Sequence, residues 1–66
     1  MDIDQAWSDL SQAVADDNWP DAAEIADNIV AWLARDGFPP RITGVKAFDT
    51  IVARATAESI AAWEVV

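Results

Sequence analysis

Three stretches with a helical spacing of apolar residues, separated by proline and glycine, constrain the fold of this chain more than any other feature. In residues 3–17 apolar side chains recur at intervals of three and four, which places them on one side of a helix. Pro20 limits this stretch, because proline cannot continue a helix and disfavours helical geometry at the residue before it. The pattern predicts an amphipathic helix whose apolar side carries Ile3, Ala6, Trp7, Leu10, Ala13 and Val14.

The second stretch predicts a helix over residues 20–36. Pro20 suits the first turn of this helix, and Asn18 or Trp19 is placed to cap it. Gly37 is predicted to end the helix as a residue in the left-handed conformation. The apolar residues cover about half of the circumference, so we expect this helix to be packed on two sides. They are Ala22, Ala23, Ile25, Ala26, Ile29, Val30, Trp32 and Leu33.

The third stretch predicts a long helix over residues 44–64, with Thr43 as its cap. We expect one apolar stripe to form its core side, made of Val45, Phe48, Ile51, Val52, Ala55, Ala62, Trp63 and Val66. Ile60 lies off this stripe, which indicates either a break in the helix or a second contact surface.

Three helices joined by short loops predict an all-α fold in one domain over residues 1–66. We expect a small three-helix bundle, a helical hairpin plus a long third helix, with the second helix in the middle. A chain of 66 residues buries only about 60% of its unfolded surface, so its stability is marginal alone. Self-association is one source of additional stability, and we expect a homo-oligomer.

The stretch "AWSDLSQAVADDNWPDAAEIA" resembles a tetratricopeptide helical hairpin over residues 6–33. In that family a W-x-x-L-small pattern on the first helix precedes an aromatic residue and alanines on the second. The matching residues are Trp7, Leu10, Ser11, Trp19, Ala22 and Ala26. The loop is about one residue short and no second repeat follows. The resemblance implies a helix-turn-helix packing mode and, by analogy, protein binding.

The formal net charge is −8, and residues 1–34 hold eight acids and no base. Nucleic acid and anionic membranes bind positive surfaces, so we expect neither as a direct partner. The acidic N-terminus and the lack of a long apolar run predict a cytoplasmic protein without a membrane segment. The chain has no cysteine and no histidine, so we expect no enzymatic activity, no metal and no cofactor.

The large apolar residues divide into predicted core and candidate contact residues. Trp7 and Trp63 lie on apolar stripes and are predicted to fill the core. Trp19 lies in the first loop and Trp32 at the edge of the second helix, so both are candidates for a contact with a partner. Ile60 joins them as a candidate on a second surface.

Acids on the first two helices form a predicted acidic face. It comprises Asp9, Asp16, Asp21, Glu24 and Asp27. Like charges three or four residues apart on a helix are slightly destabilising, which favours a functional interpretation. One hypothesis is a mimic of nucleic-acid phosphates that blocks a DNA- or RNA-binding protein, and the other is a surface that only confers solubility.

The central loop is the basic part of an otherwise acidic sequence. Asp36 at the end of the second helix and Lys46 at the start of the third both oppose the helix dipole. We predict that Asp36 pairs with Arg41 or Lys46, and that Phe38 folds onto the core. Two alternatives stay open. In one, Arg41, Lys46 and the N–H groups after Thr43 bind an anion. In the other, the basic loop meets the acidic hairpin of a second copy.

The sequence thus predicts a small non-catalytic module that binds itself or another protein through apolar surface of the second and third helices. Trp32 is its candidate anchor, and Arg41 and Lys46 are candidate partner-binding bases. The alternative hypothesis is the acidic nucleic-acid mimic.

Overall fold

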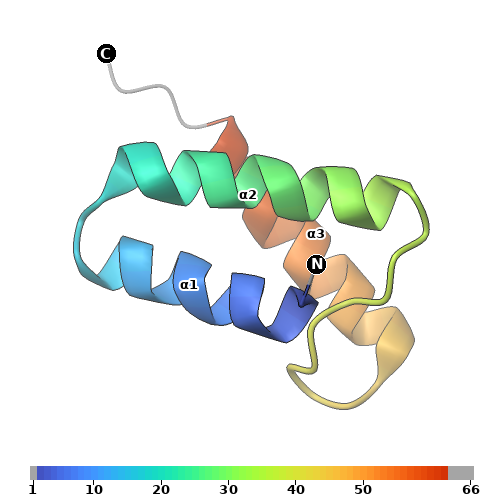
Figure 1. Cartoon of the computed structure of the whole chain (residues 1–66). Helices are drawn as coiled ribbons and strands as arrows, with labels where there is room; N and C mark the ends of the chain where they lie inside the picture. Colours follow the sequence, from blue (N-terminus) through green and yellow to red (C-terminus); the bar gives the residue numbers. More distant parts are fainter. Residues whose placement is uncertain (1, 63–66) are drawn as a thin grey trace.

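The computed structural model describes residues 2–62 and forms an all-α three-helix bundle, as the sequence predicts. The helices are α1 (Ile3–Ala15), α2 (Trp19–Ala34) and α3 (Lys46–Ala61). Figure 1 shows α1 and α2 side by side in opposite directions, with α3 crossing behind α2. α2 packs against both other helices, whereas no Cα atoms of α1 and α3 approach within 8 Å in the described part of the chain. The prediction that the second helix lies in the middle is confirmed.

α1 ends at Ala15 rather than at residue 17, because the chain turns at Asp17. Asp17 takes a φ of 54°, the left-handed conformation. The N–H of Asp17 donates to the carbonyl of Val14 at 3.1 Å, and that of Asn18 to the carbonyl of Ala13 at 2.8 Å. This pair of bonds is the Schellman motif, which satisfies the last carbonyls of a helix. Asn18 then caps α2 by accepting from the N–H of Asp21.

α2 ends by the same motif, but the left-handed residue is Asp36 with a φ of 59° rather than the predicted Gly37. The N–H of Gly37 donates to the carbonyl of Trp32 at 3.0 Å. Gly37 is required for a different reason. A Cβ atom at this position would overlap the indole ring of Trp32, so only glycine leaves room for that ring.

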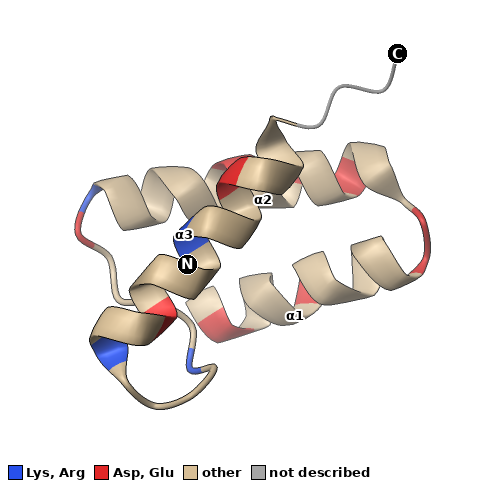
Figure 2. Ribbon diagram, turned by 180° about the vertical axis from the view of Figure 1, so that it is seen from behind, with Lys and Arg blue, Asp and Glu red and all other residues tan. Residues whose placement is uncertain are grey.

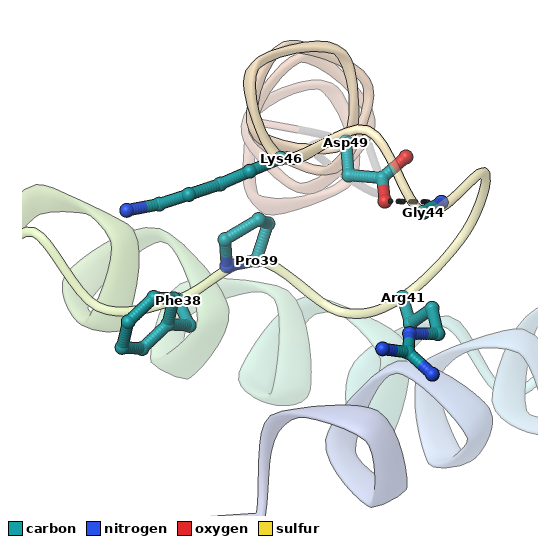
Figure 3. Close-up of a pocket in the computed structure, with 6 residues that line it drawn as sticks. All are labelled: Phe38, Pro39, Arg41, Gly44, Lys46 and Asp49. Carbon is teal, nitrogen blue, oxygen red and sulfur yellow. Dashed lines mark hydrogen bonds between the residues drawn. The ribbon is translucent and has the colours of Figure 1, made fainter.

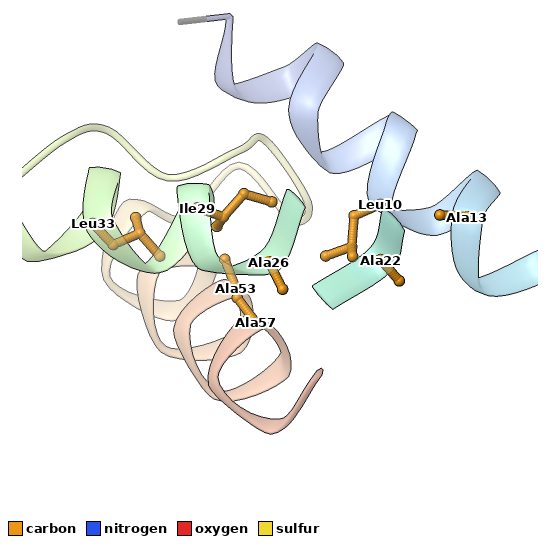
Figure 4. Close-up of a cluster of buried hydrophobic side chains, with 8 residues drawn as sticks. All are labelled: Leu10, Ala13, Ala22, Ala26, Ile29, Leu33, Ala53 and Ala57. Carbon is orange, nitrogen blue, oxygen red and sulfur yellow. The ribbon is translucent and has the colours of Figure 1, made fainter. Parts of the chain in front are cut away.

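The core lies on both sides of α2 and is built largely from small side chains (Figure 4). Ala22, Ala26 and Ile29 of α2 are fully buried, as are Ala53 and Ala57 of α3. Alanine at facing positions lets two helix backbones approach closely. Leu10 and Ala13 cover the α1 side, and Leu33 extends the cluster along α2.

The predicted core side of α3 is wrong. Its buried residues are Asp49, Ala53 and Ala57, whereas Phe48 and Ile51 of the predicted stripe are exposed. Ile60, which lies off the predicted stripe, is half-buried and packs against the core. Helix α3 begins at Lys46 rather than at residue 44. The predictions for Trp63 and Val66, and for the helix as far as residue 64, lie outside the described residues.

No helix within residues 2–62 combines the length and the apolar character needed to cross a membrane.

Candidate protein-interaction site

The outward face of α3 exposes large apolar side chains. Phe48 is 53% exposed and Ile51 67%, and Val45 just before the helix is 60% exposed. Residues 48, 51 and 55 follow at intervals of three and four, so they share the side of α3 that is opposite to Asp49, Ala53 and Ala57. All exposed large hydrophobic residues of the described chain lie between residues 38 and 51: Phe38, Ile42, Val45, Phe48 and Ile51. We call Val45, Phe48, Ile51 and Ala55 the outer face of α3.

Asp49 fixes the loop that leads into this face. Its side chain is almost fully buried, at 2% exposure. Its two oxygens accept hydrogen bonds from the backbone N–H groups of Ile42 (3.2 Å), Thr43 (2.9 Å) and Gly44 (3.1 Å), and from the hydroxyl of Thr43 (2.6 Å). Figure 3 shows Asp49 directed from the first turn of α3 towards Gly44. The carboxylate therefore holds the loop against the start of α3.

A second carboxylate extends this attachment to α1. Oδ1 of Asp4 accepts from the N–H of Arg41 at 2.8 Å, so the four consecutive N–H groups from Arg41 to Gly44 all donate to acids. Thr43 does not cap α3 as predicted, since Val45 is the capping residue and makes no side-chain bond. The Thr43 hydroxyl does accept from a backbone N–H, that of Val45 at 3.2 Å, and it donates to Asp49. Of the N–H groups after Thr43 proposed for an anion, that of Gly44 donates to Asp49 and that of Val45 donates to the Thr43 hydroxyl.

The Asp49 carboxyl has a pKa below its ordinary value of 3.8. Burial raises this pKa, because it penalises the charged form. The hydroxyl and N–H of Thr43, together with the N–H groups of Ile42 and Gly44, favour the charged form and outweigh burial. Asp49 is therefore a carboxylate at neutral pH, with its oxygens engaged by the loop.

The bases of the central loop do not form the predicted pairs. Among residues 2–62 the one ion pair is Arg54 with Glu58, at 2.9 Å. Asp36 therefore pairs with neither Arg41 nor Lys46. The Lys46 ammonium lies 4.5 Å from the ring centre of Phe38, in a cation–π contact. Phe38 itself is 68% exposed, so the prediction that it folds onto the core is wrong.

A hollow of about 230 Å³ lies between the loop and the start of α3. Phe38, Pro39, Arg41, Gly44, Lys46 and Asp49 line it (Figure 3). Two of its charged side chains, Arg41 and Lys46, have no acidic partner within 4 Å in the described chain, and the acid Asp49 is directed to the backbone. The lining of the hollow therefore includes two bases without an acidic partner in the described chain, and it borders an exposed aromatic ring.

The predicted contact residues Trp19, Trp32 and Ile60 are half-buried and pack against the core. The indole N–H of Trp32 donates to the carbonyl of Phe38 at 2.8 Å, which fastens the loop to the end of α2. Ile60 lines a groove of about 260 Å³ between α1 and α3, together with Trp7, Leu10, Ser11, Val14 and Thr56. Trp32 and Ile60 thus contribute to the fold, and the apolar side chains on the outer face of α3 are more exposed than either.

All five residues of the predicted acidic face are exposed. Asp9, Asp16 and Asp21 line one shallow groove between α1 and α2. Each accepts a hydrogen bond from a neighbouring amide, namely Gln5, Gln12 and Asn18. Glu24 and Asp27 lie along α2, outside the residues that line this groove. In Figure 2 red segments follow α1, the first connection and α2 and recur at the end of α2 and on α3, whereas the blue segments lie at the end of α2, in the loop and on α3.

Sequence reasoning missed the role of Asp49 and the exposure of Phe48 and Ile51. A signal for Asp49 was present, since it stands four residues before Ala53 and eight before Ala57 and so shares their face.

Residues 2–62 contain no group of three acids placed to hold a metal ion. Comparison of the chain with protein-family models, curated proteins and solved structures finds no match.

Proposed function

We propose that this chain is a small non-catalytic interaction module that binds itself or another protein through apolar helix surface. The observation that carries the proposal is the outer face of α3, where Phe48 and Ile51 are 53% and 67% exposed. Contiguous exposed apolar surface marks protein-interaction sites, and aromatic anchors supply much of the binding energy.

The attachment of the loop supports this role. Asp49, Asp4 and Trp32 hold the segment between α2 and α3 by hydrogen bonds from different parts of the chain. A rigid surface loses less conformational entropy on binding than a mobile one, and so binds more tightly. The resemblance of residues 6–33 to a tetratricopeptide hairpin also favours protein binding. A cytoplasmic location remains part of the proposal, on the grounds of the sequence.

Self-association is tested by sedimentation equilibrium over a wide range of concentrations. We expect the average mass to rise with concentration for the wild type and to remain monomeric for Phe48→Gln. Ala31→Gln is the matched control, because Ala31 is an exposed helical residue on α2. A wild type that stays monomeric, and that retains no protein from its native cells in a Phe48-dependent manner, contradicts the proposal.

A nucleic-acid mimic is the second candidate function. The specific observation is that Asp9, Asp16 and Asp21 gather around one exposed groove. Closely spaced carboxylates present negative charge to a basic groove on another protein, as phosphates do. The test is competition between this chain and DNA or RNA for a captured basic partner. Displacement that is lost in the triple variant Asp9→Asn, Asp16→Asn, Asp21→Asn supports the mimic, and unchanged displacement contradicts it.

A further inference from the structure

The net negative charge of the chain is confined to its first part. Residues 1–36 hold nine acids and one base, which accounts for the net charge of −8, whereas residues 37–66 hold three acids and three bases. The outer face of α3 belongs to this second, neutral part, and it points away from α2 because the opposite side of α3 is buried. Two copies that meet through this face therefore keep their acidic helices α1 and α2 apart, and electrostatic repulsion does not oppose the contact.

The exposed side of α3 has a half with large side chains and a half with small ones. Phe48 and Ile51 are the large side chains near the start of the helix. The same side continues through Ala55 to Ser59 and Ala62, at intervals of four and three residues, and all three are exposed. Close packing places large side chains opposite small ones. Two such helices meet this requirement when they run in opposite directions, whereas parallel helices place large against large.

One edge of the outer face carries a charge of each sign. Arg54 and Glu58 follow Ile51 and Ala55 by three residues, so they border the face along the same edge. They are 62% and 50% exposed and pair with each other at 2.9 Å within one chain. A two-fold axis at Ala55 places this edge beside the same edge of a second copy, with Arg54 of each copy near Glu58 of the other. The edge is therefore complementary in charge to itself.

We infer that two copies of the chain pair through the outer faces of their α3 helices, which run antiparallel about a two-fold axis at Ala55. This inference rests on the proposed function and specifies the partner as a second copy in one orientation. Phe48 and Ile51 of each copy cover Ser59 and Ala62 of the other. The small side chain of Ala55 lets the two helices approach closely at the axis. The pairing covers apolar surface that a chain of 66 residues leaves exposed on its own.

Charge reversal tests the charged edge. Arg54→Glu and Glu58→Arg each place like charges across the contact, so both are expected to weaken the dimer about 3-fold to 10-fold at low salt, as measured by sedimentation equilibrium. This effect shrinks as salt is added. The double variant Arg54→Glu, Glu58→Arg restores opposite charges and is expected to associate like the wild type.

The controls separate this contact from a general effect of charge. The two single variants change the net charge in opposite directions, so repulsion between acidic chains does not weaken both. Arg35→Glu makes the same charge change as Arg54→Glu at an exposed residue outside α3, and it is expected to leave the dimer nearly unchanged. Circular dichroism confirms that each variant is folded.

Cysteine cross-linking tests the direction of the helices, since the chain has no cysteine of its own. A disulfide requires Cα atoms within about 7 Å. In the antiparallel pair residue 51 lies opposite residue 59, whereas the two copies of residue 51 lie about 12 Å apart along the helix axis. With oxidised glutathione, Ile51→Cys and Ser59→Cys are expected to form a mixed disulfide faster than either forms a disulfide alone. Ala31→Cys gives the rate of random collision, because Ala31 is exposed on α2.

The outcomes separate this inference from the proposed function. If association depends on Phe48 but neither charge reversal weakens it, or if Ile51→Cys chains link to each other faster than to Ser59→Cys chains, the antiparallel pair is overturned and the interaction role stands. A wild type that stays monomeric but retains a native protein in a Phe48-dependent manner excludes the second copy and leaves the binding of another protein. If the chain stays monomeric and retains no such protein, both fail.

Discussion

The face of α3 that packs against α2 carries Asp49, Ala53 and Ala57, whereas the opposite face carries Phe48, Ile51 and Ala55. In a helix at the edge of a small bundle, the larger apolar side chains are usually expected to be inside. Here the inside holds two alanines and a carboxylate. The difference between the faces indicates that the close approach of α2 and α3, rather than the size of the apolar side chains, determines which residues of α3 are buried.

The carboxylate on the inner face completes this arrangement. Asp49 is buried on the same face of α3 as Ala53 and Ala57, at the end of the helix where the loop of residues 41–44 is attached. A buried charge is costly unless hydrogen bonds compensate it, and four donors do so here. The inner face is therefore specified by hydrogen bonds and close packing, and the outer face remains available for a partner.

The largest effect is expected from removing the charge of Asp49. In Asp49→Asn the amide group brings a donor towards backbone N–H groups that need an acceptor, so several hydrogen bonds weaken together. We expect a marked fall in the free energy of unfolding, measured by urea denaturation. Faster hydrogen exchange is expected at the amides of residues 42–44.

Glu58→Gln is the control for this substitution. It removes an exposed acid from the same helix, along with its ion pair to Arg54. Exposed i, i+4 pairs contribute only about 0.3–0.5 kcal/mol, so this variant should remain close to the wild type. If Asp49→Asn and Glu58→Gln are equally stable, the attachment of the loop by Asp49 does not specify the inner face.

The next largest effect is expected from enlarging an alanine of the inner face. Ala53 is fully buried against α2, so Ala53→Leu forces the two helices apart at a cost of about 1–3 kcal/mol. Ala55→Leu adds the same side chain two residues later, on the outer face, and should change the stability by less than about 0.5 kcal/mol. Urea denaturation measures both. Equal costs would show that the two faces do not differ in packing.

The pH dependence of stability tests the same carboxylate without relying on one substitution. The pKa of Asp49 is lowered in the folded state, so its ionised form stabilises the fold. That contribution is fully present above the unfolded value near 3.8 and is lost as the pH falls through the lower folded value. We expect the stability difference between the wild type and Asp49→Asn to shrink below about pH 4.

Taking this difference removes the effect of the other acids, because both proteins share them. Unfolding free energies of both proteins, measured from neutral pH down to about pH 2, give this stability difference as a function of pH. A difference that stays constant over this range would mean that Asp49 has the same pKa in the folded and unfolded chain. The hydrogen bonds between Asp49 and the loop would then add no stability that depends on the charge of Asp49.

The class of fold and the order of the helices were predictable because they depend on local patterns. Pro20 and the glycine-containing loop divide the chain, and the apolar period of three and four residues identifies each helix. The helix ends were less predictable, since Asp17 and Asp36 adopt the left-handed conformation that glycine favours. Which residue at a helix end takes this conformation depends on neighbours such as Trp32, whose indole occupies the space beside Gly37.

The inner face of α3 was not predictable from apolar periodicity, because that signal ranks side chains by size and hydrophobicity. Phe48 and Ile51 gave the stronger stripe, and the alanine row that includes Asp49 gave the weaker one. Tertiary contacts decided between them, since Ala53 and Ala57 lie beside Ala26 of α2 in the core (Figure 4), where close packing admits only small side chains. The hydrogen bond from the N–H of Arg41 to Asp4 spans 37 residues, and no local rule predicts it.

The smallest effect on stability is expected on the outer face itself. Ile51 is 67% exposed, so Ile51→Gln removes little buried area and introduces a residue that is at least as favourable in a helix. We expect the free energy of unfolding to change by less than about 0.5 kcal/mol, while the self-association of the proposed function weakens several-fold. Urea denaturation and sedimentation equilibrium on the same sample measure the two quantities. A loss of stability above about 1 kcal/mol would place Ile51 in the core, and the outer face would then be a second packing surface rather than a site for a partner.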